Sequence, residues 1–118
     1  MSACPHPPSG APDPAALREH ARDACALLKA LANEDRLMLL CSMGSGRCNV
    51  SELEAATGIR QPTLSQQLAV LRQEGLVDTE KEGKFVYYRL DNPQAIRMMA
   101  TLWEIYCAPQ EAPSTTQP

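Results

Sequence analysis

The sequence of 118 residues lacks any apolar run that approaches the roughly 18 residues of a membrane span. Its N-terminus also lacks the charged and then apolar pattern of an export signal. From these two absences we expect a cytoplasmic protein with no membrane partner. A chain of this length can form one domain with a modest core, in which a deep substrate pocket would be difficult to build. We therefore expect binding or sensing, with no catalytic residue.

The five cysteines include no Cys-x-x-Cys pair, which excludes the commonest thioredoxin-like and zinc-ribbon motifs. Their odd number, in a chain without an export signal, argues against a structural disulfide framework, so we expect them to be reduced. The two histidines, His6 and His20, have no matching ligand partners. We accordingly predict no metal site and no cofactor.

The stretch from Val50 to Val77 has the pattern of two short helices joined by a tight turn. Ser51, with a glutamate three residues later, predicts a capping box, and Gly58 suits the C-terminal cap of this first helix. Pro62 suits the first position of a second helix, which Gly75 would end. Two helices joined this closely are typical of a helix-turn-helix motif.

The second helix has an apolar face and a polar face. Leu64, Leu68 and Leu71 recur at spacings of four and three, which predicts that they point into the core. The other face carries small and amide side chains, namely Thr63, Ser65, Gln66, Ala69 and Gln73. Hydroxyl and amide groups can bond to base edges and phosphates. An ordinary solvated surface explains the same pattern equally well.

The formal net charge of −3 is unusual for a DNA-binding protein, because Lys and Arg supply much of the affinity for DNA. The distribution of charge is more favourable. Arg60 and Arg72 flank the second helix, and Lys81, Lys84 and Arg89 follow it. We expect DNA binding that needs two copies of the site and that depends strongly on salt.

Two short runs with strand patterns follow, from Leu76 to Lys81 and from Phe85 to Leu90, on either side of a Glu-Gly turn. They predict a β-hairpin. Directly after a helix that contacts DNA, such a hairpin would be a wing, with Lys84 at its tip placed to contact a phosphate. A small hairpin that only stabilises the fold is the alternative interpretation.

Two helices are expected before the helix-turn-helix. The first, from Ala15 to Leu31, is rich in alanine and is expected either to cover the core or to pair with a second copy; Cys25 would pack beside that seam. Asn33 would cap the second, on which Cys41 shares a face with two leucines and should point inward. Cys48 is expected at the surface of the loop that follows.

A last helix is predicted to begin with Asn92 or Asp91 as its cap and to end at Cys107. Its Met, Trp and Tyr stripe is expected in the core or in a dimer interface. Residues 1–14 and 108–118 are rich in proline and polar residues and are expected to be disordered tails. The folded domain would then span residues 15–107.

This order of elements, together with the sequence from Gln61 to Val77, resembles the ArsR family of winged-helix repressors. Leu31–Leu37 and Glu82–Leu90 are similar to the family's second-helix opening and wing. The resemblance implies a mainly α fold with a small β-hairpin, a winged helix-turn-helix that forms a homodimer on operator DNA. It places Thr63, Ser65 and Gln66 in the major groove, with the two helices of a dimer about 34 Å apart. Gln61 and Lys84 complete the predicted DNA contacts.

The family divides by what its members sense. Its thiolate metal sensors carry a Cys-x-Cys pair where this chain has Asn49 and Ser51, and its zinc sensors carry Asp and His ligands in the last helix, which here has neither. Cys41 and Cys107 instead resemble the persulfide-sensing BigR/SqrR subgroup. That resemblance implies that reactive sulfur species link Cys41 to Cys107 by a disulfide or polysulfide bridge, which weakens DNA binding and releases sulfide-detoxification genes.

Two alternatives remain open from the sequence. In the first, a metal ion or haem is the ligand of the repressor and is bound by Cys107 with Cys41 or Cys48. In the second, the chain is a small sulfur-transfer protein that moves sulfane sulfur between partners, although it has no evident reactive loop.

Overall fold

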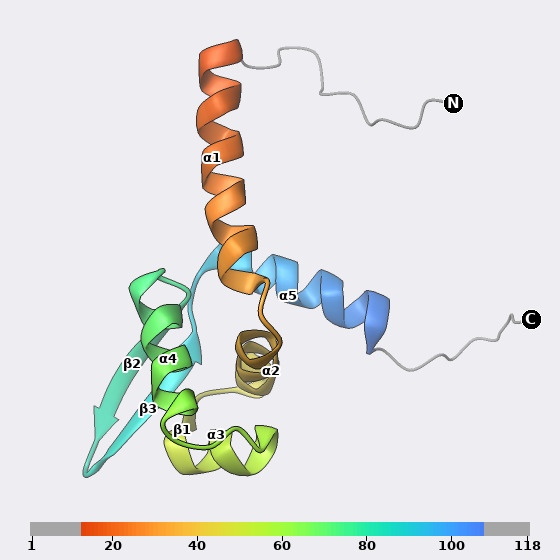
Figure 1. Cartoon of the computed structure of the whole chain (residues 1–118). Coiled ribbons are helices and arrows are strands. Elements are labelled where there is room, and N and C mark those ends of the chain that lie inside the picture. The colour runs from red at the N-terminus through yellow and green to blue at the C-terminus, as the bar shows by residue number, and fades with distance from the viewer. Residues whose placement is uncertain (1–12, 108–118) are drawn as a thin grey trace, which may run out of the picture.

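The computed structural model describes residues 13–107 as a helical body with a three-stranded sheet at one side (Figure 1). The elements in chain order are α1 Pro14–Leu31, α2 Glu34–Ser42, the 3₁₀ turn η1 Met43–Ser45, β1 Cys48–Asn49, α3 Val50–Thr57, α4 Thr63–Gln73, β2 Val77–Glu82, β3 Phe85–Leu90 and α5 Pro93–Tyr106. This order confirms the predicted winged helix-turn-helix. No helix in the described range is both long and apolar enough to cross a membrane.

Side-chain caps set the starts of the four helices α1, α2, α3 and α5. Asp13, Asn33 and Asn92 each accept a bond from the backbone N–H three residues later, at 2.9, 3.0 and 2.9 Å. The predicted caps Asn33 and Asn92 are thus confirmed. Helix α1 begins at Pro14, inside the predicted tail of residues 1–14. The remainder of the two predicted tails lies outside the described residues.

The capping box predicted at Ser51 is wrong by two residues. Asn49 accepts a bond from the Glu52 N–H at 2.9 Å, and the Glu52 carboxylate accepts one from the Asn49 N–H at the same distance. Asn49 is held in an extended conformation because it pairs with Tyr87 in the sheet, so the helix starts directly after it. Gly58 ends α3 in the left-handed conformation, with φ of 76°, as predicted.

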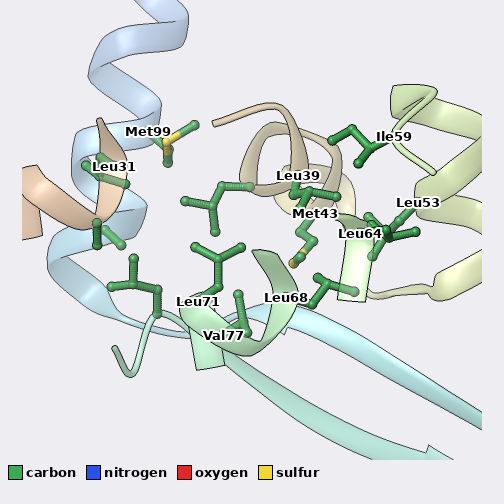
Figure 2. Packing of buried hydrophobic residues seen from close by; sticks show 14 residues of the cluster. Leu31, Leu39, Met43, Leu53, Ile59, Leu64, Leu68, Leu71, Val77 and Met99 are labelled. Carbon is green, nitrogen blue, oxygen red and sulfur yellow. The ribbon is translucent and has the colours of Figure 1, made fainter. Parts of the chain in front are cut away.

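The core lies where α2, α3 and α4 meet the last turn of α1 and the first half of α5 (Figure 2). Seven leucine side chains are fully buried there, namely Leu39, Leu40, Leu53, Leu64, Leu68, Leu71 and Leu76. The predicted inner face of α4 is therefore confirmed. Each buried leucine contributes about 1.5–3 kcal/mol from removal of apolar surface from water.

Helix α1 covers the core only with its last turn, where Ala30 and Leu31 are buried, and the rest projects from the body (Figure 1). Leu17 and Leu28 are 57% and 51% exposed. Cys25 is exposed in the single chain, so the packing predicted for it would require a second chain.

The sheet is antiparallel with strand order β1-β3-β2. The predicted hairpin is present, with Val77 opposite Leu90 and Glu82 opposite Phe85, and β2 is shifted by one residue from the predicted range. The short strand β1 was not predicted. It places Cys48 opposite Tyr88 and half-buried, whereas the sequence predicted a loop surface.

Candidate DNA-binding surface and cysteine sites

The turn before α4 and the first half of α4 bring together four of the five predicted DNA-contacting residues. Gln61, Ser65 and Gln66 are exposed, and Thr63 is half-buried. The Gln61 Oε1 atom accepts a bond from the Ser65 backbone N–H at 3.1 Å, so it serves as a cap for a helix whose cap position is Pro62. The N-terminus of a helix carries partial positive charge, which favours a nearby phosphate.

Helix α4 is fixed in place by Arg36 of α2. The Arg36 Nη1 atom donates to Gln67 Oε1 at 2.9 Å, while Nε donates to the carbonyl oxygen of Ala30 at 2.6 Å and Nη2 to that of Lys29 at 3.2 Å. One guanidinium thereby joins the end of α1 to the middle of α4. Since Gln67 lies beside Gln66 in the chain, this bond fixes the rotation of the polar face.

Lys84, the fifth predicted contact, lies in the turn between β2 and β3, and it is exposed at the tip of the hairpin. Gly83 precedes it with φ of 62°, a conformation that the tight turn requires. Within residues 13–107, Lys81 and Lys84 form no ion pair, so their charges are available to a phosphate. Lys84 and the α4 residues therefore lie on two different elements, the hairpin and the helix.

Arg47, for which no sequence pattern predicts a role, lies between η1 and β1. Its Nη1 atom is 3.3 Å from Glu80 Oε1 and its Nη2 atom bonds to Glu82 Oε1. The guanidinium carbon lies 4.1 Å from the centre of the Tyr87 ring, within cation–π range. The bond to Glu82 raises the pKa of Arg47 above its ordinary value, and Glu80 contributes in the same direction.

Cys41 lies on the surface in the single chain, and the prediction that it points inward is wrong. Leu39 and Leu40 form the buried face of α2. Cys41, the next residue along the helix, lies outside that face. Cys107 is also exposed and occupies the C-terminal cap of α5.

A groove of about 570 Å³ lies between α2 and α5. Cys41 lines it together with Ile96, Met99 and Trp103 of α5. The Trp103 carbonyl oxygen accepts a bond from the Cys107 backbone N–H at 2.7 Å, which places Cys107 one helical turn beyond the groove. Cys41 of α2 therefore lines the groove directly, whereas Cys107 lies outside its lining, at the C-terminal cap of α5.

Cys48 has different surroundings from the other described cysteines. Its Sγ–H points at the carbonyl oxygens of Ser42 and Gly46, at 3.6 and 3.7 Å. Burial raises the pKa of the Cys48 thiol, and the negative charge of Glu52 raises it further. Among residues 13–107, no group of three His, Cys, Asp or Glu side chains is arranged to hold a metal ion.

Comparison with known proteins agrees with this architecture. The family described as bacterial regulatory protein, arsR family, matches residues 33–79. The chain is 50% identical over 96 residues to the biofilm growth-associated repressor of Agrobacterium fabrum, covering 81% of this chain and 82% of that protein. It superposes on the crystal structure of the transcriptional repressor BigR from Xylella fastidiosa with a TM-score of 0.74 and 42% identity, over 80% of this chain and 97% of that one.

A second similar structure is the homodimeric winged helix-turn-helix DNA-binding domain Mb0332 from Mycobacterium bovis, with a TM-score of 0.66 and 31% identity over 82% of this chain and 88% of that one. Both the sequence identities and the coverage of the relatives are high enough to assign the family. The chain therefore belongs to the ArsR family of bacterial regulatory proteins, as a DNA-binding transcriptional repressor and not an enzyme.

Proposed function

We propose that this repressor acts as a homodimer on operator DNA and is released from it when reactive sulfur species bridge Cys41 and Cys107. The observation that carries the proposal is the groove between α2 and α5. Cys41 lines it, and Trp103, which also lines it, bonds to the backbone of Cys107 at 2.7 Å. Loss of DNA binding would release sulfide-detoxification genes.

The dimer is supported by apolar side chains that the single chain leaves in water. On α1 these are Leu17 and Leu28, and near the end of α5 they are Ile105 and Tyr106, which are 62% and 79% exposed. Apolar groups on two neighbouring projecting helices are typical of an interface between subunits. A two-fold dimer would place two copies of α4 about 34 Å apart, the spacing of successive major grooves on one side of DNA.

The bridging chemistry needs a persulfide and both thiols. The thiolate of one cysteine attacks the outer sulfur of a persulfide R–S–SH, which forms a cysteine persulfide and releases the thiol R–SH. The second cysteine thiolate then attacks the inner sulfur, which forms the disulfide and releases H₂S. If both cysteines are persulfidated first, attack of one persulfide on the other gives a trisulfide and also releases H₂S.

Geometry decides which bridge forms. A plain disulfide requires the two Cα atoms to lie within about 7 Å, and each inserted sulfur relaxes that limit. Cys41 lies one residue before the end of α2 and Cys107 is the C-terminal cap of α5, so a disulfide would fix the end of α2 close to the end of α5. A longer bridge would need less movement of the helices.

The test combines DNA affinity with intact mass. Reduced protein first selects a tight-binding duplex from random-sequence DNA, and its affinity for that duplex is then measured before and after treatment with a persulfide donor. We expect treatment to weaken binding by at least about 10-fold, the lower part of the range of allosteric couplings. Peptide mapping of the same sample should show Cys41 and Cys107 joined.

Three variants give the controls. Cys41→Ser and Cys107→Ser should bind DNA when reduced and should keep binding after treatment. Cys25→Ser removes another exposed thiol, on α1, and should respond like the unmodified chain. A bridge between other cysteines, or DNA release by a metal ion or haem with no bridge, would refute the proposal.

A further inference from the structure

Arg47 crosses the full width of the small sheet. It precedes β1, its guanidinium lies over Tyr87 of the central strand β3, and it ends on Glu80 and Glu82 of the outer strand β2. The strand register explains this placement. Glu80 is opposite Tyr87 and Glu82 is opposite Phe85, so the acids and the ring lie on one face of the sheet.

The hairpin has no net charge of its own. From Val77 to Leu90 it holds three acids, Asp78, Glu80 and Glu82, and three bases, Lys81, Lys84 and Arg89. Asp78 is paired with Arg89 at 3.3 Å. Without Arg47, Glu80 and Glu82, which precede and follow Lys81 but lie on the opposite face of β2, would be unpaired negative charges beside the wing lysines and would repel the phosphates that the lysines attract.

We propose that Arg47 is a positioning residue for DNA binding, which neutralises Glu80 and Glu82 so that Lys81 and Lys84 of the wing can contact the phosphate backbone. The role concerns the reduced, DNA-bound protein and is independent of the chemistry of the cysteines. It also assigns Lys81 a phosphate contact beside that of Lys84. The specificity for sequence remains with α4, because phosphate contacts carry no sequence information directly.

Distance limits the effect to charges near the tip. Glu82 is the residue before the Gly83–Lys84 turn, whereas Asp78 lies four residues further back, or about 13 Å along an extended strand. At 0.1 M salt, interactions between exposed charges are screened beyond about 10 Å. Arg89, which pairs with Asp78 and Asp91, therefore provides a matched control that loses one arginine and exposes two acids far from the tip.

The test measures the affinity of the reduced full chain for the duplex selected from random-sequence DNA, at several salt concentrations. Arg47→Ala should weaken binding by about 10-fold at 0.1 M salt and make the dependence on salt shallower, because phosphate contacts by the wing are lost. Arg47→Lys, which keeps the charge, should stay within about threefold of the unmodified chain. Arg89→Ala should change affinity by less than about threefold.

A charge-restoring variant separates electrostatics from folding. Arg47→Ala combined with Glu82→Gln has the same net charge in this region as the unmodified chain, since one base and one acid are removed. It should recover at least half of the lost free energy of binding and the steeper dependence on salt. A purely structural role of Arg47 predicts no such recovery.

Three results would overturn the proposal: unchanged affinity in Arg47→Ala, no recovery in the double variant, or an equal loss in Arg89→Ala. Circular dichroism and thermal unfolding check that each variant is folded, and exposed ion pairs contribute little to folding. If Arg47→Ala does not fold, Glu80→Gln with Glu82→Gln in the otherwise unmodified chain decides instead. That variant retains Arg47 and should bind the duplex more tightly, and equal or weaker binding would refute the role of the two acids.

Discussion

Replacement of Arg36 by alanine should destabilise the protein strongly, because this side chain joins three elements. It donates to Gln67 of α4 at 2.9 Å and to the carbonyl oxygens of Ala30 and Lys29 at the end of α1, at 2.6 and 3.2 Å. A hydrogen bond from a charged donor contributes about 1.5–3 kcal/mol when it is shielded from water. Two of the three bonds are part-buried and the third is exposed.

From these contacts we expect Arg36→Ala to lower the free energy of unfolding by about 2–4 kcal/mol, since the exposed bond adds little. Arg36→Lys should recover less than half of this loss, because an ammonium group cannot reproduce the guanidinium's fork of donors. Gln67→Ala removes one partner only and should lower the free energy of unfolding by about 1 kcal/mol.

Urea denaturation followed by circular dichroism at one fixed protein concentration gives these values, because the stability of a dimer depends on concentration. Arg60→Ala is the control. Arg60 is 80% exposed and its one ion pair, with Glu54, measures 3.9 Å, so its loss should change stability by less than about 0.5 kcal/mol. The reasoning is refuted if Arg36→Ala is no more destabilising than Arg60→Ala, or if Arg36→Lys is as stable as the unmodified chain.

Two further outcomes test local features. Asn49→Ala removes one half of the capping box at α3 and should lower the free energy of unfolding by about 1 kcal/mol, whereas Ser51→Ala, at the cap expected from the sequence, should leave it nearly unchanged. Because the pKa of Cys48 is raised and only thiolate reacts, alkylation of Cys48 at mildly alkaline pH should be slower in the folded chain than in urea, and Glu52→Gln should accelerate it; equal rates would contradict the assigned environment.

Local periodicity was sufficient to predict the inner face of α4. Leu64, Leu68 and Leu71 are spaced for one side of a helix, and all three are buried. Gly58 and Gly75, which end α3 and follow α4, both adopt positive φ, of 76° and 74°. These features depend on residues within a few positions of one another, so the sequence carries them directly.

The cap of α3 shows where a local pattern becomes ambiguous. Both Asn49 with Glu52 and Ser51 with Glu54 satisfy the spacing of a capping box. The pairing of Asn49 with Tyr87 in the sheet selects the first, because it holds Asn49 in an extended conformation. A strand of two residues is too short to show an alternating pattern. The sequence alone therefore does not show which of the two capping boxes forms.

The prediction that Cys41 points inward is wrong for a related reason. Its spacing from Leu37 and Leu40 fits one helical face, but α2 contacts the core mainly through Leu39 and Leu40, and the surface of Cys41 stays in water. In a helix of nine residues, a small rotation about the helix axis changes which residues at the edge of the buried face are covered. The packing of α2 against the neighbouring helices fixes that rotation.

The long-range contacts of Arg36 and Arg47 could not be predicted from spacing either. Arg36 reaches a residue 31 positions later and Arg47 one 35 positions later. Both contacts depend on how α4 and the hairpin fold back onto the segment after α1. A basic residue in such a segment has no local signal that separates it from a solvated side chain.

The distribution of charge explains how a chain with a net charge of −3 can bind a polyanion. From Arg60 to Gln73 the turn and α4 contain two arginines and no acid, so this segment carries a net positive charge. On the hairpin, ion pairs occupy all three acids and leave the two lysines unpaired among the described residues. Screening over about 10 Å makes these local charges, and not the charge of the whole chain, decide the interaction with phosphate. The net negative charge of the chain therefore arises outside these two segments, and among those other acids Glu54 of α3 lies 3.9 Å from Arg60.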